Sequence, residues 1–233
     1  MARYDTIDVG GSPMKIYIAV PESEGPRPAV IVMCHGAGLD EFTEDVADRM
    51  AAAGYIGAAP EVFHRQPGVT DSAVIRENIV DGEIATDIEA AIAHLEAVEN
   101  VRGDRSGIIG HCMGGRMSLL GACANPRFSA AVVYYGGNVM KSWGGKEPPP
   151  FERLGDIACP VLGFFGNDDE NPSPDDVDRI EAELARHGVE HEFHRYDGAG
   201  HAFQNFLSEE RYRERPSNEA WGITFEFLAE RLS

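Results

Sequence analysis

A cysteine framed by glycines is the residue whose surroundings most clearly indicate chemistry. After an apolar run at 106–109 the chain reads Gly-His-Cys-Met-Gly-Gly around Cys112, and a helical pattern begins at once. On so tight a strand-to-helix turn, the residues two places before and after a nucleophile must be small, and Gly110 and Gly114 stand there. The helix N-terminus beside the thiol adds partial positive charge, which favours the reactive thiolate. The pattern predicts that Cys112 is a catalytic nucleophile.

A thiol nucleophile needs a base, and the base needs an acid that orients it. Residues 166–172, which follow an apolar strand, are rich in carboxylates and contain Asp168 and Asp169. Further on, Gly-Ala-Gly-His-Ala-Phe places His201 between small residues after another strand. The chain order of nucleophile, acid and histidine is that of the α/β-hydrolases. Each signal is weak by itself, but their order and their positions after strands make the combination strong.

Short apolar strands alternate with helical patterns, which predicts β-α-β units in a three-layer α/β/α sandwich with a mostly parallel sheet. A hairpin of 4–9 and 14–20 is expected at the sheet edge. Further strands are expected at Ala29–Met33, Ile56–Ala59, Ser106–Ile109, Ala130–Tyr135, Val161–Phe165 and Glu192–Tyr196. Helices are expected at Glu41–Ala53, Glu83–Val98, Gly115–Ala124, Pro174–His187 and Pro216–Leu232. The length of 233 residues favours one domain over 1–233.

Two long connections, 60–78 and 136–150, fit no regular element. Both leave the carboxyl ends of strands, the edge at which open α/β sheets bind ligands, so we expect them to wall a pocket. The candidate substrate contacts on or near them are Tyr135, Trp143, His64, Arg65 and Arg76. An aromatic residue such as Tyr135 more often packs in the core, which is the alternative role for it.

Composition excludes several classes of function. The formal net charge is -19 and the basic residues form no cluster, so binding to nucleic acid or to an anionic membrane is not expected. Residues 1–19 have no basic segment followed by an apolar one, and no run of about 18 apolar residues occurs, so we expect neither secretion nor a membrane span. The remaining cysteines, Cys34, Cys123 and Cys159, have no C-x-x-C spacing and are expected to be buried, without a disulfide or metal. We therefore expect a cytoplasmic monomer that acts on a small molecule.

The segments around Cys112, Asp169 and His201 resemble the dienelactone hydrolase family of cysteine-dependent α/β-hydrolases. The likeness covers nearly the whole chain, including the strand 29–33, the Ala-Gly-Tyr at 53–55, the Tyr-Tyr-Gly at 134–136 and the Gly-His-Ala-Phe at 200–203. The resemblance implies hydrolysis of a dienelactone or related small ester without a metal or organic cofactor. In the family the acid commonly stands three residues after the glycine that closes its strand, which selects Asp169, with Asp168 as the fallback.

The chain departs from the family in two places. The glutamate that usually helps to ionise the cysteine is absent from 34–39, which read Cys-His-Gly-Ala-Gly-Leu. The arginine usually found shortly after the histidine is also absent, since Gln204 and Asn205 stand there. Residues 35–38 instead look like the glycine-rich oxyanion loop of general esterases, so the backbone N–H groups of Met113 and Ala37 are the expected oxyanion donors.

The expected reaction is cleavage of a small ester or lactone through a thioester acyl-enzyme. The two departures leave a broad carboxylesterase or a thioesterase as alternatives, which acyl-chain preference would distinguish. A binding or redox protein that keeps the fold without turnover is a third possibility, and the intact order of the three catalytic residues argues against it.

Overall fold

The computed structural model describes residues 1–233 except 23–24, 99–100 and 146. Within that part of the chain the strands are β1 (Ala2–Val9), β2 (Ser12–Ala19), β3 (Arg27–Met33), β4 (Ile56–Pro60), β5 (Val101–His111), β6 (Phe128–Tyr134), β7 (Val161–Gly166) and β8 (His191–Tyr196). The helices are α1 (Glu41–Ala52), α2 (Ser72–Asn78), α3 (Asp81–Val98), α4 (Met113–Ala124), α5 (Pro174–His187) and α6 (Glu214–Leu232), with a 3₁₀ helix η1 (Pro150–Asp156).

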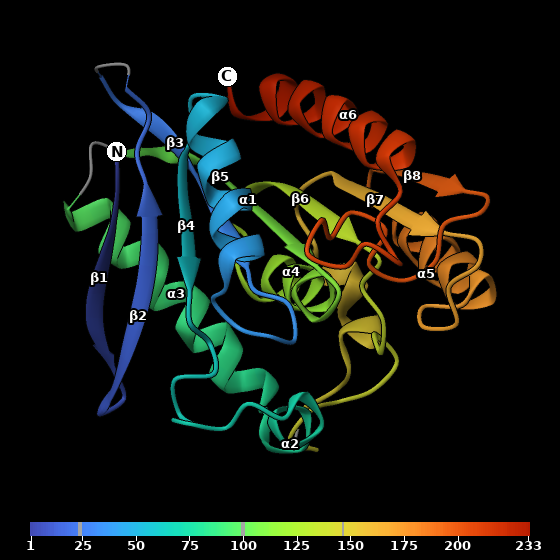
Figure 1. Ribbon diagram of the computed structural model, residues 1–233, viewed down its shortest axis with the longest axis horizontal. Helices are drawn as coiled ribbons and strands as arrows, with labels where there is room; N and C mark the ends of the chain where they lie inside the picture. Colours follow the sequence, from blue (N-terminus) through green and yellow to red (C-terminus); the bar gives the residue numbers. More distant parts are fainter. Residues whose placement is uncertain (23–24, 99–100, 146) are drawn as a thin grey trace.

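All of these strands belong to one sheet in the order β1-β2-β4-β3-β5-β6-β7-β8 (Figure 1). The hairpin β1–β2 is antiparallel and lies at the edge, as predicted, and β2 pairs antiparallel with β4. From β4 to β8 every pairing is parallel. Parallel neighbours carry their carboxyl ends to the same edge, so the turns after β3, β5, β7 and β8 come together there.

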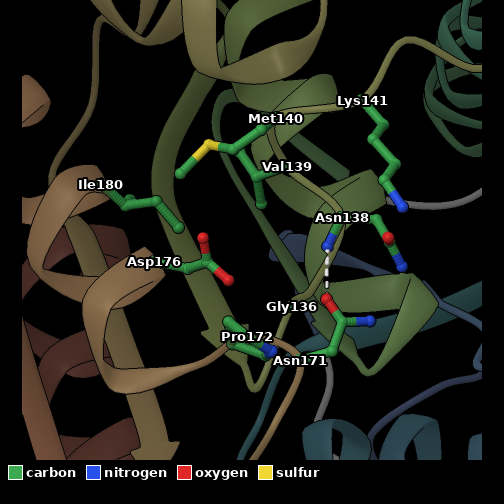
Figure 2. A pocket seen from close by; sticks show the side chains of 9 residues that line it. All are labelled: Gly136, Asn138, Val139, Met140, Lys141, Asn171, Pro172, Asp176 and Ile180. Carbon is green, nitrogen blue, oxygen red and sulfur yellow. Dashed lines mark hydrogen bonds between the residues drawn. The ribbon is translucent and has the colours of Figure 1, made fainter.

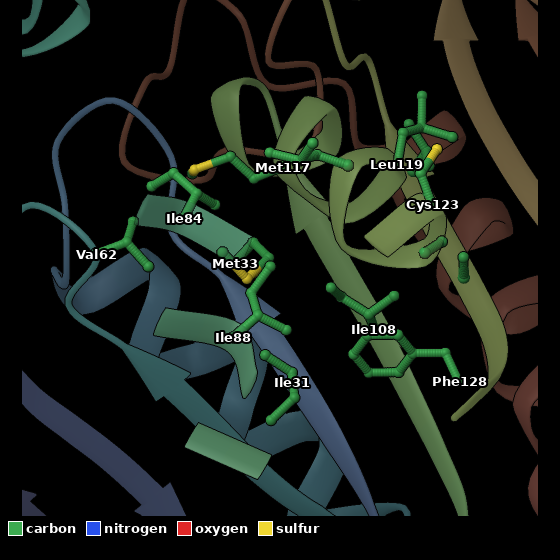
Figure 3. Close-up of a cluster of buried hydrophobic side chains, with 14 of the residues drawn as sticks. Ile31, Met33, Val62, Ile84, Ile88, Ile108, Met117, Leu119, Cys123 and Phe128 are labelled. Carbon is green, nitrogen blue, oxygen red and sulfur yellow. The ribbon is translucent and has the colours of Figure 1, made fainter. Parts of the chain in front are cut away.

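Helices cover both faces of the sheet and create two apolar cores. On one face α3, α4 and α5 pack against the sheet, and Figure 3 shows part of this core, where Ile88 of α3 lies near Ile31 and Ile108 of the central strands. On the other face α1 and α6 contribute Phe42, Val46, Trp221 and Leu228, among others. The central strand β3 is buried from Pro28 to Met33, as expected of a strand covered on both faces. The predicted three-layer α/β architecture is confirmed.

Three local features differ from the sequence-based expectation. Helix α2 lies inside the connection 60–78, and its seven residues are too few to establish a helical period. The 3₁₀ helix η1 starts at the last residue of a triple-proline run. Strand β5 begins at Val101, which pairs with Arg27 before a shift in register, although it lies outside the apolar run that marked the strand. No helix in the described residues is long and apolar enough to cross a membrane.

Candidate active site

Cys112 occupies a strained turn between β5 and α4. Its backbone has φ 57° and ψ −118°, a conformation that side-chain-bearing residues rarely adopt and that is typically found at functional sites. The flanking glycines make the turn possible: a Cβ on Gly110 would lie 2.2 Å from the carbonyl oxygen of Gly114, and one on Gly114 would lie 2.2 Å from that of Met33. The turn therefore requires glycine at both positions for steric reasons.

Three side chains from three turns form a continuous hydrogen-bonded relay. Nε2 of His201, which follows β8, lies 3.0 Å from Sγ of Cys112. Nδ1 of His201 lies 2.8 Å from Oδ2 of Asp169, which follows β7. Asp169 is 6% exposed, and its second oxygen accepts a hydrogen bond from the backbone N–H of Asn171 at 2.8 Å. Asp168 is exposed, so Asp169 is the carboxylate within reach of the histidine.

The electrostatics of the relay favour a thiolate and imidazolium pair. Burial acts to lower the pKa of His201, but its hydrogen bonds to Asp169 and Cys112 outweigh burial and raise that pKa to about 10. Burial acts to raise the pKa of the Cys112 thiol, but the hydrogen bond with His201 and those from the backbone N–H groups of Met113 and Gly36 lower it overall. A cysteine ionised in this way is a ready nucleophile.

The relay opens into a cavity of about 240 Å³. The residues that line it are Arg76, Cys112, Met113, Gly137, Asn138, Trp143, Asp169, Glu170, Asn171 and His201. Residues from both of the long connections, represented by Arg76 and Trp143, therefore form walls of the same cavity as the thiol. Acyl transfer from an ester to sulfur is a reaction that this arrangement of nucleophile, base and orienting acid can perform.

Comparisons with known proteins identify the family of the chain. A model of the dienelactone hydrolase family matches residues 14–232. The chain belongs to that family. This dienelactone hydrolase family member is 31% identical over 216 residues to a Synechocystis protein provisionally named carboxymethylenebutenolidase, covering 88% of this chain and 87% of that protein.

Two further relatives cover nearly the whole chain. A Bradyrhizobium protein provisionally named 2-oxo-3-(5-oxofuran-2-ylidene)propanoate lactonase is 30% identical, with 96% of this chain and 93% of that protein covered. A solved structure from Klebsiella pneumoniae, provisionally named a dienelactone hydrolase, superposes with a TM-score of 0.91 at 28% identity and 98% coverage of both chains. The α/β-hydrolase fold of this family member is thereby shown.

Two predicted substrate contacts of this family member, His64 and Arg65, lie away from the cavity. His64 Nε2 is 3.3 Å from Oδ1 of Asp87 in α3. The guanidinium of Arg65 donates to both oxygens of the same carboxylate, at 2.7 and 2.8 Å. The side chain of His64 is 2% exposed, and it bonds on its other side to the Ser12 hydroxyl at 3.0 Å. Both residues hold the connection 60–71 to the body of the protein, because the buried Asp87 needs cationic and hydrogen-bonding partners.

Tyr135 and Ala37 also occupy different places from those predicted. Tyr135 is buried, and the edge of its ring meets the His201 ring with 5.3 Å between centroids, so it packs behind the imidazole and does not line the cavity. Ala37 lines a separate cavity of about 350 Å³ together with His64. The loop residue whose backbone N–H acts to lower the pKa of Cys112 is Gly36, one residue before the predicted oxyanion donor.

The sequence-based prediction missed a buried ion pair that shapes the cavity wall. Arg116 of α4, fully buried, donates to Asp81 at the start of α3 with 2.6 Å between Nη1 and Oδ1. Its guanidinium carbon lies 3.6 Å from the ring centroid of Trp143, and Asp81 accepts the backbone N–H of Trp143 at 2.9 Å. The signal that could have revealed the pair is Arg116, the one charged residue in the otherwise uncharged helical segment 113–124.

A second hollow of about 170 Å³ lies next to the catalytic cavity (Figure 2). Asn138 and Asn171 line both spaces, and the backbone N–H of Asn138 donates to Oδ1 of Asn171 at 3.1 Å, drawn as the dashed line in Figure 2. This asparagine pair therefore forms a shared wall. Among the described residues, no cluster of histidine, cysteine, aspartate and glutamate is arranged to hold a metal ion.

Proposed function

We propose that this protein hydrolyses a small ester or lactone with Cys112 as nucleophile, His201 as acid and base, and Asp169 as the residue that orients His201. The observation that carries the proposal is the continuous relay, with 2.8 Å between Asp169 and His201 and 3.0 Å between His201 and Cys112. The names of two relatives, a carboxymethylenebutenolidase and a lactonase, support a lactone as the substrate class.

In the first half of the reaction the Cys112 thiolate attacks the substrate carbonyl carbon and forms a carbon–sulfur bond. The backbone N–H groups of Met113 and Gly36, which already stabilise the thiolate, are suited to receive the developing oxyanion. As the tetrahedral intermediate collapses, the carbon–oxygen bond breaks and Nε2–H of His201 protonates the departing alkoxide. A thioester with Cys112 and a neutral His201 remain, and a lactone substrate is thereby opened.

In the second half His201 acts as a base. Its Nε2 takes a proton from a water molecule, whose oxygen attacks the thioester carbonyl. The carbon–sulfur bond then breaks, the acid leaves and the thiolate and imidazolium pair is restored. Asp169 keeps the Nδ1–H of His201 directed towards it through both halves, which leaves Nε2 facing the reaction, and its charge stabilises the imidazolium.

The cavity gives one clue to substrate charge. Besides His201, Arg76 is the cationic side chain among the described residues that line it, and it is exposed, while Glu170 adds a negative charge. One cationic hydrogen-bond donor for a substrate carboxylate is therefore available, but an anionic substrate is not strongly selected. This observation favours a broad carboxylesterase as the second candidate, with Trp143 as an apolar wall for varied groups.

The test is steady-state hydrolysis of a dienelactone, p-nitrophenyl acetate and a short acyl thioester by the wild type and Cys112→Ala. We expect turnover of at least one compound and a loss of at least about 10³-fold in kcat in Cys112→Ala. Cys159→Ala, which removes a buried cysteine outside the cavity, is the matched control and should keep wild-type activity. Equal rates for wild type and Cys112→Ala would reject the proposal.

We also infer a cytoplasmic, monomeric protein. All four cysteines are free, which suits a reducing compartment. Size-exclusion chromatography with light scattering tests the monomer directly, and a stable dimer at micromolar concentration would contradict it.

A further inference from the structure

A second buried contact joins the two segments that carry the nucleophile and the base. His111 is the last residue of β5, directly before Cys112, and Gln204 stands three residues after His201. Nε2 of His111 lies 2.5 Å from Oε1 of Gln204, and each residue is 2% exposed. Gln204 is thus directed into the protein interior and is absent from the lining of the catalytic cavity.

The direction of this hydrogen bond follows from the contacts around it. The amide nitrogen of Gln204 donates to the backbone carbonyl of Ser217 in α6 at 3.4 Å, which leaves its carbonyl oxygen facing His111. His111 must therefore donate from Nε2–H. Burial lowers the pKa of His111 to about 3, so the ring stays neutral at any working pH and the bond does not depend on protonation.

Aromatic side chains pack against His111 and against the neighbour of Gln204. The ring of His111 stacks on Tyr134 with 4.3 Å between centroids and meets Phe42 edge-on at 5.0 Å. Phe203, the neighbour of Gln204, packs its ring against Tyr135 at 5.2 Å. Both ends of the hydrogen bond are thus anchored in packed aromatic side chains, and a bond between anchored groups can fix a distance between their backbones.

We propose that the hydrogen bond between His111 and Gln204 is a cross-brace that sets the separation of Cys112 and His201. His111 and Gln204 are then positioning residues for the reaction. Among the described residues, two hydrogen bonds join 111–113 to 201–204: the one between His111 and Gln204, and the one between Cys112 and His201. Other hydrogen bonds hold the turn that bears His201, among them Asp168 N–H to the carbonyl of Ala199 at 3.0 Å and Arg213 N–H to that of Phe203 at 2.8 Å, but these two do not join the turn to Cys112. A misplacement of about 1 Å in a catalytic group can cost about 10²-fold in rate.

The inference rests on the proposed roles of Cys112 and His201, and its test separates the two claims. The variants are His111→Phe, which keeps an aromatic ring on Tyr134, Gln204→Met, which keeps chain length, and the double variant. We expect each single variant to lose roughly 10- to 100-fold in kcat with KM changed less than about twofold. The double variant should lose no more than the worse single variant, because both remove the same bond.

A second measurement reports on the thiol without turnover. The pH at which iodoacetamide alkylates Cys112 at half its maximal rate should rise in both single variants, because a more distant imidazolium stabilises the thiolate less. A role in core packing alone would lower the unfolding temperature without moving this midpoint. If His111→Phe does not fold, Gln204→Met decides the question, since it leaves β5 and its ring stack intact.

Thr224→Val is the matched control. It removes another buried hydrogen bond to α6, the 2.6 Å contact between the hydroxyls of Tyr134 and Thr224. The Tyr134 hydroxyl still donates to the carbonyl of Ala220 at 3.2 Å, so the ring that stacks on His111 stays in place. Thr224→Val should lose about as much thermal stability as the single variants, but it should keep the wild-type kcat and alkylation midpoint. The proposal is overturned if the single variants keep wild-type kcat and midpoint, if their losses multiply in the double variant, or if Thr224→Val loses as much kcat. An active Cys112→Ala would instead defeat the proposed function.

Discussion

Burial acts to raise the pKa of the Cys112 thiol, whereas its neighbours, mainly His201, act to lower it. The effect of the neighbours is the larger, so the pKa is lowered overall. We therefore expect iodoacetamide to alkylate Cys112 with a midpoint below the pKa of about 8.5 of a free cysteine. His201→Ala removes the main partner of the thiolate, so the midpoint should rise to that value or above it. Mass spectrometry after limited labelling checks the site, because burial raises the pKa of Cys123 and Cys159 to about 12. A wild-type midpoint above that of His201→Ala would contradict the ion pair.

Asp169 and Asp168 are neighbours with different environments, which makes them a matched pair of test sites. Asp169→Asn removes the charge that stabilises the imidazolium of His201 and presents a donor to Nδ1, so kcat should fall by about 10²–10⁴-fold. Asp168→Asn changes an exposed carboxylate with the same substitution and should keep kcat within about twofold of wild type. Steady-state kinetics at a fixed pH decide between them, and a loss confined to Asp168→Asn would reverse the assignment.

The three residues proposed as catalytic were singled out because a glycine-framed turn, a carboxylate-rich turn and a histidine-bearing turn each follow a strand, in the chain order of the α/β-hydrolases. The choice between Asp168 and Asp169 needed the family resemblance, since adjacent residues share almost the same sequence context. The effect of the Gly36 backbone N–H on the pKa of Cys112 could not be predicted from the sequence, because the direction of a backbone N–H depends on local dihedral angles. The spacing of residues in the sequence locates a loop, but it does not show in which direction each backbone N–H of the loop points.

At the scale of the elements, helices α3 and α4 are joined through the buried pair of Asp81 and Arg116, which also holds Trp143 in the cavity wall. Arg116→Met leaves the Asp81 carboxylate buried without its cation, so we expect a loss of about 3–5 kcal/mol in the free energy of unfolding. KM should rise as well, because Trp143 loses the guanidinium under its ring. Urea unfolding and steady-state kinetics measure the two effects.

Arg127→Met is the control for that loss. Arg127 pairs with Glu89 and Glu96 between partly exposed side chains, and such a pair contributes under about 1 kcal/mol. If Arg116→Met lowers the free energy of unfolding no more than Arg127→Met does, the Asp81–Arg116 pair does not hold the cavity wall in place.

Elements with an apolar run or a helical period were predictable, whereas α2 and η1 were not. The apolar runs of the parallel strands and the period of α5 fixed their positions, and α5 spans the same residues as predicted. Helix α2 has no such period, and its place beside the cavity follows from tertiary packing of Ile75 and Ile79. The roles of His64 and Arg65 were misjudged for a related reason, since their partner Asp87 lies on α3, more than twenty residues away along the chain.

At the scale of the whole molecule, a formal net charge of -19 on 233 residues implies mutual repulsion across the surface. Raising NaCl from low concentration to about 0.5 M at pH 7 shortens the Debye length and should raise Tm by roughly 2–4 °C, which corresponds to about 1 kcal/mol for a chain of this size. At pH 4.7, the isoelectric point of the sequence, the same addition should have little effect. An unchanged or lower Tm at pH 7 would mean that local ion pairs outweigh the general repulsion.

The central claim, that Cys112 carries the acyl group between two half-reactions, can be tested by trapping the intermediate. Wild-type protein is mixed with p-nitrophenyl acetate, quenched in acid within the first turnover and analysed by intact-protein and peptide mass spectrometry. We predict a burst of nitrophenolate and one acetyl group located on Cys112, with neither in Cys112→Ala. Turnover without a burst or a labelled Cys112, or an acetyl group on another residue that persists in Cys112→Ala, would contradict the account.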